Sequence, residues 1–368
     1  MTTINSRLYF FIGTEAELIK MVPVMKINIE RGINIKIIAS GQNNIDNSKM
    51  LLFLGKDIDI YLTKKSVTQT PLGLLLWIIK SLTVGLSEFR KEFGFSRRKD
   101  TWLIIHGDTV STVIGAILGR LYGLRIAHVE AGYQSSNLLN PFPEEIDRRI
   151  ASFLSDTLFC PFDSIGVKRE IDSRSKKSIN IGYNTSIDTL NLALEYKRDP
   201  LILSQINKKY FIFALHRQET LINTKKFVHI VRTIANLNTD LHCVFTIHSP
   251  TKKVLQDLGL LDELLKNNKV HMVDRIDYFE YVTLLYRSEF IMTDGVGNQQ
   301  ESFYLGKPCL LLRDITEGME GIDSNAMLYA NKIENIEYFV ENYVNFQRNR
   351  IQCTTSPSSI ISEYLLSH

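Results

Sequence analysis

The stretch SEFIMTDGVGNQQESFYLGKPCLLL, residues 288–312, contains a complete strand–turn–helix–strand unit. Its apolar segments FIM and CLLL are typical of buried strands, and the residues between them leave room for a helix. Gly295 and Gly297 stand where the first strand passes into that helix. Two strands joined through a helix are characteristic of a parallel sheet that is covered on both faces. This stretch therefore predicts an α/β fold.

The same alternation of short apolar strands and helical periodicity runs along the whole chain. We expect strands at 7–13, 34–40, 101–107, 124–130 and 157–162, and again at 210–216, 242–248, 269–274, 290–295 and 308–314. Two such series predict two doubly wound, Rossmann-like domains, and 368 residues are too many for one ordinary core. The polar segment 192–209 separates the series. We therefore expect domains at 1–190 and 191–350, followed by a C-terminal helix in 351–368.

The composition is that of an ordinary globular protein, with 44% hydrophobic and 23% charged residues. The 43 basic and 40 acidic residues nearly balance, which gives no reason to expect a nucleic-acid partner. The four cysteines are far apart and form no CxxC pair, so we expect free thiols in a reducing cytoplasm and no zinc site.

The most apolar segment, residues 71–86, is shorter than the roughly 20 residues of a membrane-spanning helix, and Lys80 interrupts it. It predicts a buried helix and no membrane span, with contact to a membrane surface as the alternative. The N-terminus lacks the pattern of a signal peptide.

Polar, titratable or glycine residues follow nearly every predicted strand. The motifs at these positions include HGDT, HVEAG, ALHRQE, TIHSP and TDGVG. Ligands of doubly wound sheets bind outside the carboxyl ends of the strands. We therefore expect a cleft between the two domains, lined by His, Asp and Glu side chains and by backbone amides.

The turn at Gly295 and Gly297 can hold a phosphate. A helix that begins near Asn298 would direct free N–H groups and a positive dipole end at an anion. Glu301, one turn later, could accept hydrogen bonds from ribose hydroxyls. An ordinary strand-to-helix turn explains the glycines equally well, and neither GxGxxG nor a P-loop motif occurs.

Three carboxylates are candidates for acid/base chemistry. Glu130 ends an apolar strand, where burial would raise its pKa and suit it to proton transfer. Glu144 opens a helix that carries Arg148, and Asp108 follows another strand. Helix capping is the alternative role for Asp108 and Glu144. When the HGDT segment is considered by itself, capping is the favoured role of Asp108.

Two histidines also follow strands. His216 is succeeded at once by Arg217 and Glu219, which raises its interest as a catalytic group, although a single histidine is more often structural. His248 also follows a strand, and it is a weaker candidate for a catalytic group. Neither a nucleophile elbow nor a pair of histidines at zinc-site spacing is present.

In this order, the motifs resemble those of the bacterial non-hydrolysing UDP-N-acetylglucosamine 2-epimerases. The matching pieces are GTEAELIKM at 13–21, HGDT at 106–109, HVEAG at 128–132, PFPEEIDRR at 141–149, GYNTSID at 182–188, HRQE at 216–219 and the region from TDGVGNQQE to LLRDITE at 293–317. They cover nearly the whole chain. The resemblance implies a GT-B-like fold whose last helix crosses back to the first domain.

The resemblance also implies an activity. Members of this family convert UDP-N-acetylglucosamine reversibly to UDP-N-acetylmannosamine for surface polysaccharides such as capsule or O-antigen, by eliminating UDP and adding it back to 2-acetamidoglucal. Asp108, Glu130, Glu144 and His216 match the catalytic positions, and Lys20, Arg148, Gly295, Gly297, Glu301 and Arg313 match substrate-binding positions. The resemblance implies no cofactor and no metal. It does imply a homodimer in the cytoplasm.

The chain departs from the family pattern mainly by losing positive charge. Arginines usual in the family are replaced at Glu15, Gln134, Gln218 and Gly318, and glycine replaces a serine at 295. The acid/base set is intact, so we interpret the chain as a divergent member. Gln42 and His248 resemble part of a second, activating nucleotide-sugar site of some relatives, from which Gln218 departs.

Several alternatives stay open at this point. The chain could be a hydrolysing 2-epimerase, although the first loop typical of those enzymes is absent, or an epimerase acting on another UDP-2-acetamido sugar. It could also be a GT-B glycosyltransferase, since fold does not determine function. A catalytically silent UDP-sugar-binding protein is the fourth reading, which the lost arginines favour and the retained carboxylates oppose.

Overall fold

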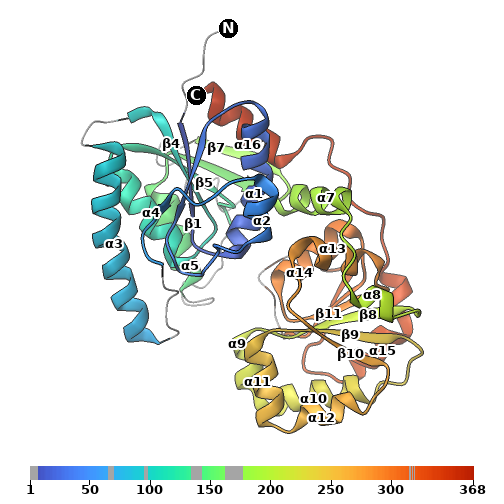
Figure 1. Cartoon of the computed structure of the whole chain (residues 1–368). Helices are drawn as coiled ribbons and strands as arrows, with labels where there is room; N and C mark the ends of the chain where they lie inside the picture. The colour runs from blue at the N-terminus through green and yellow to red at the C-terminus, as the bar shows by residue number, and fades with distance from the viewer. Residues whose placement is uncertain are drawn as a thin grey trace. The chain divides into compact units, whose positions relative to one another are not determined.

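The structure is a computed structural model (Figure 1). It describes residues 7–64, 70–94, 98–133, 143–161, 177–314, 316, 318 and 320–368. The described chain divides into two compact units. The first comprises the described residues up to Thr189 together with Thr354–His368, and the second is Leu190–Cys353. Each unit contains one parallel sheet with helices, which confirms the predicted pair of Rossmann-like folds.

The first unit is built on a seven-stranded parallel sheet. Its strands are β1 (Arg7–Ile12), β2 (Ile35–Ala39), β3 (Ile60–Tyr61), β4 (Arg98–His106), β5 (Leu124–Val129), β6 (Thr157–Pro161) and β7 (Lys177–Gly182). The strand order is β3-β2-β1-β4-β5-β6-β7, so the direction of winding changes between β1 and β4. The sequence did not predict β3 or β7, because β3 has two residues and β7 is largely polar.

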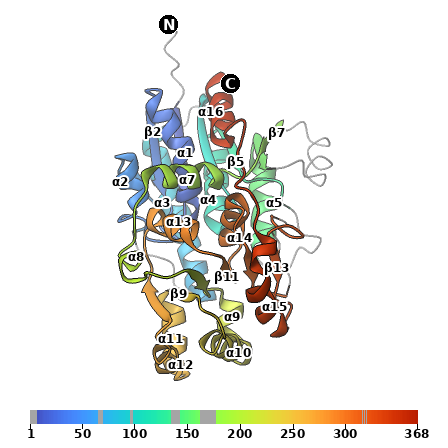
Figure 2. The same cartoon turned by 90° about the vertical axis from the view of Figure 1, so that its right-hand side faces the viewer.

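Helices cover both faces of this sheet. They are α1 (Glu15–Glu30), α2 (Lys49–Leu54), α3 (Pro71–Phe93), α4 (Val110–Leu121), α5 (Glu144–Leu154) and α16 (Pro357–Ser367), while α7 (Ser186–Tyr196) leads into the second unit. Figure 1 shows α3 and α4 on one side of the sheet and α1 and α16 on the other. The C-terminal α16 lies beside α1, as Figure 2 also shows, and Ser362 Oγ donates to Asn28 Oδ1 at 3.1 Å.

Helix α3 is less buried than the sequence predicted. It buries one edge, including Trp77, Phe89 and Phe93. Its opposite face is apolar and exposed, with side chains Leu72, Leu75, Leu76, Ile79 and Leu86. The prediction of a buried helix was wrong for this face, because only one side of the helix can reach its neighbours in the unit. Among the described helices, α3 is also the one long and apolar enough to cross a membrane, which by itself is weak evidence for a span.

The second unit is built on a six-stranded parallel sheet. Its strands are β8 (Tyr210–Ala214), β9 (His242–Ile247), β10 (Val270–Asp274), β11 (Ile291–Thr293), β12 (Cys309–Leu311) and β13 (Ala326–Leu328), in the order β10-β9-β8-β11-β12-β13. Winding reverses between β8 and β11. The turns that follow these two neighbouring strands carry His216 and Gly295, which brings them together.

The helices of the second unit are α8 (Ile202–Gln205), α9 (Gln218–Ile222), α10 (Thr224–Ala235), α11 (Ser249–Asp257), α12 (Leu260–Leu265), α13 (Tyr278–Arg287), α14 (Val296–Leu305), α15 (Glu334–Asn342) and the 3₁₀ helix η1 (Tyr343–Phe346). Helices α13 and α14 lie on one side of the sheet and α10, α11 and α12 on the other (Figure 1). Buried phenylalanines from β8, β9 and the start of β11 fill the core between these layers.

Candidate active site

Glu130 is the centre of a charged cluster at the carboxyl end of the first sheet. Lys20 Nζ, from α1, donates to both carboxylate oxygens, at 2.9 Å to Oε1 and 2.7 Å to Oε2. His106 Nε2, at the end of β4, lies 2.9 Å from Oε2 without the alignment of a hydrogen bond. Glu130 itself has a φ of 64°, a left-handed conformation that side chains rarely adopt. Such backbone strain concentrates at functional sites.

The charge state of Glu130 differs from the expectation. Burial raises the pKa of Glu130, but Lys20 and His106 lower it by a larger amount and hold that pKa well below its usual range. The prediction of a raised pKa was wrong, because the sequence did not show that a lysine 110 residues away contacts this carboxylate. Glu130 is therefore ionised at neutral pH and can accept a proton.

Asp108 is bound by Arg148 rather than capping a helix. The Arg148 guanidinium, on α5, donates to Asp108 Oδ2 and also lies 3.2 Å from Glu145 Oε2. Thr109 caps α4 instead, since its side chain accepts from Thr112 N. The motif thus supplies the helix cap through Thr109, whereas capping by Asp108, the reading favoured for that residue alone, was wrong.

Glu144 is the first residue of α5, and Asp147 lies one turn further on. Glu144 Oε2 and Asp147 Oδ2 are buried, and neither has a hydrogen-bond partner among the described residues. Burial, followed by the charges of Asp108 and Glu144, raises the pKa of Asp147 to about 7. Sequence reasoning missed Asp147, although it stands in the quoted motif PEEID. It adds a carboxyl group that titrates near neutral pH beside two carboxylates proposed as acid/base groups.

Two further carboxylates organise the loop after β1. Glu17, which is buried and was not singled out, accepts from Gly13 N at 2.6 Å and from Thr109 Oγ1 at 2.7 Å. It thereby joins the loops that follow β1 and β4. Glu15, at a position where the family usually has an arginine, accepts from Ser48 Oγ at 2.7 Å.

Gln42, one of the two residues assigned to an activating site, is also in this unit. Its Oε1 accepts from Ser111 Oγ at 2.6 Å and from Ser111 N at 3.2 Å. The side chain therefore holds the start of α4. His248, the other residue assigned to that site, belongs to the second unit, so its relation to Gln42 stays a prediction.

The turn predicted to hold a phosphate, in the second unit, begins its helix earlier than expected. Helix α14 starts at Val296 with Gly295 as its N-cap, not near Asn298. The Thr293 hydroxyl accepts from Gly295 N and from Asn298 Nδ2, both at 3.0 Å, which fixes the turn. A Cβ on Gly297 would meet nothing within 4 Å, so the first turn of α14 is open to a ligand.

His216 and His248 stack at the carboxyl ends of β8 and β9, with ring centroids 5.2 Å apart. His216 Nδ1 lies 3.4 Å from Asp294 Oδ1. Burial, then the charges of His216 and Arg275, lower the pKa of His248 to about 4. His248 is therefore a neutral imidazole at physiological pH.

Glu301 and Arg313, two further predicted binding residues, occupy different parts of the second unit. Glu301 is 9% exposed, and its carboxylate lies near the phenols of Tyr278 and Tyr281. Burial and that charge raise the pKa of both phenols far above their usual value. Arg313 follows β12. Burial raises the pKa of Glu219, but a hydrogen bond from its own backbone N–H, Arg217 and then Arg313 together lower it below its usual value. Arg217, Arg313 and Arg275, which directly follows β10, therefore remain at the strand ends of this unit.

Gly318 stands where the family usually has an arginine. A second departure from the family pattern, Gln300, lies nearby in the structure. Gln300 Nε2 donates to Glu320 Oε1 at 3.0 Å, and both side chains are buried. The neighbouring Gln299 donates to the carbonyl oxygens of Gly318 and Glu320. An amide at 300, where the family usually has a carboxylate, can bond Glu320 without a cation between them. Gln218 opens α9, and Gln134 lies outside the described residues.

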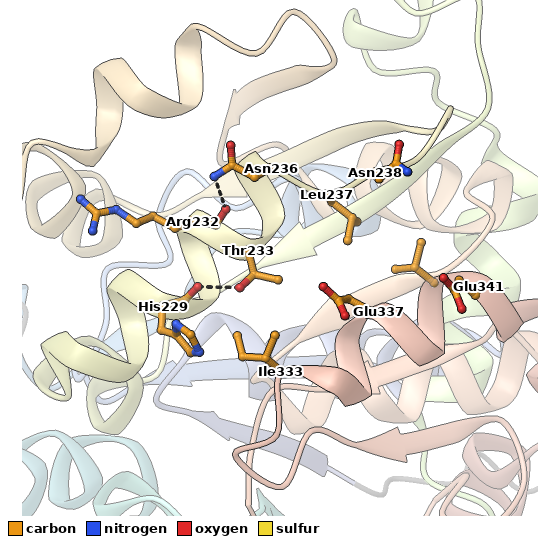
Figure 3. Close-up of a pocket in the computed structure, with 10 residues that line it drawn as sticks. His229, Arg232, Thr233, Asn236, Leu237, Asn238, Ile333, Glu337 and Glu341 are labelled. Atoms are coloured by element: carbon orange, nitrogen blue, oxygen red, sulfur yellow. Dashed lines mark hydrogen bonds between the residues drawn. The ribbon is translucent and has the colours of Figure 1, made fainter.

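A separate hollow of about 450 Å³ lies between α10 and α15 of the second unit (Figure 3). Two of its polar side chains bond to the main chain of α10: Asn236 donates to the Arg232 carbonyl and Thr233 to the His229 carbonyl. Because it contains none of the predicted site residues, we do not assign the activity to it. Among the described residues, no group of three His, Cys, Asp or Glu side chains could hold a metal ion.

Known proteins resemble this chain over most of its length. The family model of UDP-N-acetylglucosamine 2-epimerase matches residues 25–357. A UDP-N-acetylglucosamine 2-epimerase of Methanococcus maripaludis is 29% identical over 352 residues, which covers 92% of each chain. A UDP-2,3-diacetamido-2,3-dideoxy-D-glucuronate 2-epimerase of Pseudomonas aeruginosa is 31% identical over 62% of this chain and 63% of its own. The crystal structure of the Neisseria meningitidis UDP-GlcNAc 2-epimerase bound to UDP-GlcNAc superposes with a TM-score of 0.81 at 26% identity, covering 98% of this chain and 100% of that one.

Proposed function

The chain belongs to the UDP-N-acetylglucosamine 2-epimerase family, and from this we propose that it interconverts UDP-N-acetylglucosamine and UDP-N-acetylmannosamine. The observation that carries the proposal is the Lys20–Glu130–His106 cluster, in which a strained strand end presents an ionised carboxylate held by two basic side chains. The P. aeruginosa relative favours a second candidate, namely C2 epimerisation of another UDP-2-acetamido sugar.

We propose that the reaction proceeds by elimination and re-addition of UDP. A base removes the C2 proton while the C1–O bond breaks, so that its electron pair leaves with UDP and a C1=C2 double bond forms. UDP oxygen then adds back to C1, and an acid delivers a proton to the opposite face of C2. Return on the opposite face requires more than one acid/base group, and Glu130, Asp108, Glu144 and His216 are the candidates.

The departing diphosphate needs positive charge and backbone N–H groups, which stabilise the developing negative charge. In the second unit, the open first turn of α14 and the nearby Arg217 and Arg313 are suited to this role. In the first unit, Lys20 and Arg148 add two cations, each paired with a carboxylate. We propose that both sets of residues act on one UDP-sugar, with Glu301 bound to its ribose.

The remaining parts of the proposal concern the setting. We propose a cytoplasmic enzyme that supplies a capsule or O-antigen pathway, and the buried thiols of Cys160, Cys243 and Cys309 fit a reducing compartment. We also propose a homodimer. The exposed apolar face of α3 supports it, because a contiguous patch of leucines is unfavourable in water and would be buried against a second copy.

The decisive experiment is proton NMR of UDP-N-acetylglucosamine incubated with the enzyme in D2O. UDP-N-acetylmannosamine that carries deuterium at C2 supports the proposal, whereas free N-acetylmannosamine with UDP indicates the hydrolysing reaction. An unchanged spectrum, repeated with a trace of UDP-N-acetylmannosamine as activator, would reject this substrate and turn attention to other UDP-2-acetamido sugars or to glycosyl transfer. Glu130→Gln and His216→Ala should each abolish turnover in a folded protein, and wild-type rates would contradict the assigned roles.

A further inference from the structure

The ring of His216 occupies space that exists because residue 295 is glycine. A Cβ on residue 295 would stand 2.5 Å from His216 Cε1 and 3.1 Å from Nε2, which is too close for real atoms. The ring also stacks on the ring of His248, at an interplanar angle of 20°. The imidazole therefore packs against both the backbone of Gly295 and the ring of His248, and we call this position the His216 seat. The family resemblance places a serine at 295, where this chain has glycine.

Asp294 forms a third boundary of the same seat. Its side chain is fully buried, at 0% exposure. It accepts from His216 N at 3.1 Å through Oδ1 and from Arg217 N at 3.1 Å through Oδ2, so it orders the turn that carries His216. The same Oδ1 lies 3.4 Å from His216 Nδ1.

Nδ1 is the nitrogen of the His216 ring that faces this carboxylate, at 3.4 Å and without the alignment of a hydrogen bond. An ionised carboxylate only accepts hydrogen bonds, so it favours the tautomer with a proton on the facing Nδ1. Nε2 then keeps its lone pair and can take up a proton. A carboxylate that orients a histidine in this way acts through the histidine and does not itself need to contact the substrate.

We propose that Asp294 is the positioning residue for His216, setting its Nδ1–H tautomer, and that Gly295 is the residue whose missing side chain admits the ring. The effect on turnover rests on the proposed epimerase function. The tautomer and the position of the His216 ring are independent of that function.

Long-range proton–nitrogen NMR of the histidine side chains tests the proposal at pH 7.5, with the His216 signals assigned by their loss in His216→Ala. The wild type should show the Nδ1–H tautomer at His216. Asp294→Asn, which is nearly isosteric, should shift His216 toward the Nε2–H form, because the Asn amide can donate to Nδ1. The same variant should lower kcat at least roughly tenfold with little change in KM for the UDP-sugar.

A second variant keeps the proposal testable if Asp294→Asn folds poorly. Gly295→Ala leaves the carboxylate in place but should displace the ring, which would shift the His216 and His248 signals together and lower kcat. Gly297→Ala is the matched control for the spectrum, since it adds the same methyl group two residues after Gly295, where its Cβ would enter open space. It should leave the His216 signals in place.

The outcomes separate this inference from the proposed function. An unchanged Nδ1–H tautomer in Asp294→Asn, or His216 signals unmoved in Gly295→Ala, would overturn it even in an active epimerase. A wild-type protein without epimerase activity would reject the proposed function, yet the tautomer and ring signals would still decide whether Asp294 and Gly295 position His216.

Discussion

Replacing Lys20 by methionine tests whether Glu130 depends on this lysine for its charge. Methionine keeps the length and helix propensity of lysine but removes the ammonium group. Breaking a fully buried ion pair costs about 3–5 kcal/mol, whereas an exposed pair contributes less than about 1 kcal/mol. The Lys20 and Glu130 side chains are 19% and 15% exposed, so we expect a loss of about 2–3 kcal/mol at pH 7. In a unit of this size, that lowers Tm by about 4–12 °C.

The pH dependence supplies an independent check. Because the folded state lowers the pKa of Glu130, the pair stabilises the protein above the unfolded value of about 4.3, and this contribution disappears as the pH falls through the folded value. The difference between wild type and Lys20→Met should therefore be largest near pH 7 and shrink on acidification. In the double variant Lys20→Met/Glu130→Gln, neither partner of the pair keeps a charge. About 1–3 kcal/mol of the lost free energy of unfolding should therefore be recovered.

Urea denaturation followed by tryptophan fluorescence is suited to this measurement. The chain's two tryptophans, Trp77 and Trp102, are both buried in the first unit, so their emission reports the unfolding of that unit. Lys26→Met is the matched control, since Lys26 pairs with Glu30 on the exposed surface of the same helix, and it should cost less than about 1 kcal/mol. A loss for Lys20→Met no greater than for this control, or one independent of pH, would refute the reasoning.

Three further predictions follow from individual side chains. Asp147→Asn should leave stability unchanged near pH 4 but raise it by about 4 kcal/mol at pH 8, because a folded pKa of about 7 means that ionising Asp147 destabilises the fold as the pH rises; equal urea midpoints at pH 8 would contradict this. Glu15→Arg should tighten UDP binding in calorimetry if the side chain faces the diphosphate, and an unchanged affinity would confine Glu15 to its bond with Ser48. Arginine at Leu75 and Leu76 should convert the proposed homodimer to a monomer in analytical ultracentrifugation without changing the fold, whereas an unaltered assembly would exclude the α3 face as the interface.

The motifs and the strand pattern predicted the family, the enzyme class and the two-sheet fold, and each of these was confirmed. They succeeded because strand and helix periodicities are local, and because ligand residues of doubly wound sheets follow the strands directly. Elements with a weak local pattern were missed, as with the two-residue β3 and the polar β7. The roles assigned to Asp108, Glu144, Arg148 and the other predicted site residues remain proposals.

The amino-acid sequence by itself determined which chemical groups stand at the strand ends and in what order. Only the tertiary structure decided their state: Glu130 has a low pKa because Lys20 reaches it from helix α1, and Asp147 has a high pKa because it is buried and lies near two other carboxylates. The seat of His216 likewise depends on Asp294 and Gly295, which are nearly 80 residues away along the chain. Charge, tautomer and exposure depend on distant neighbours and on the water they exclude, and a local sequence pattern contains neither.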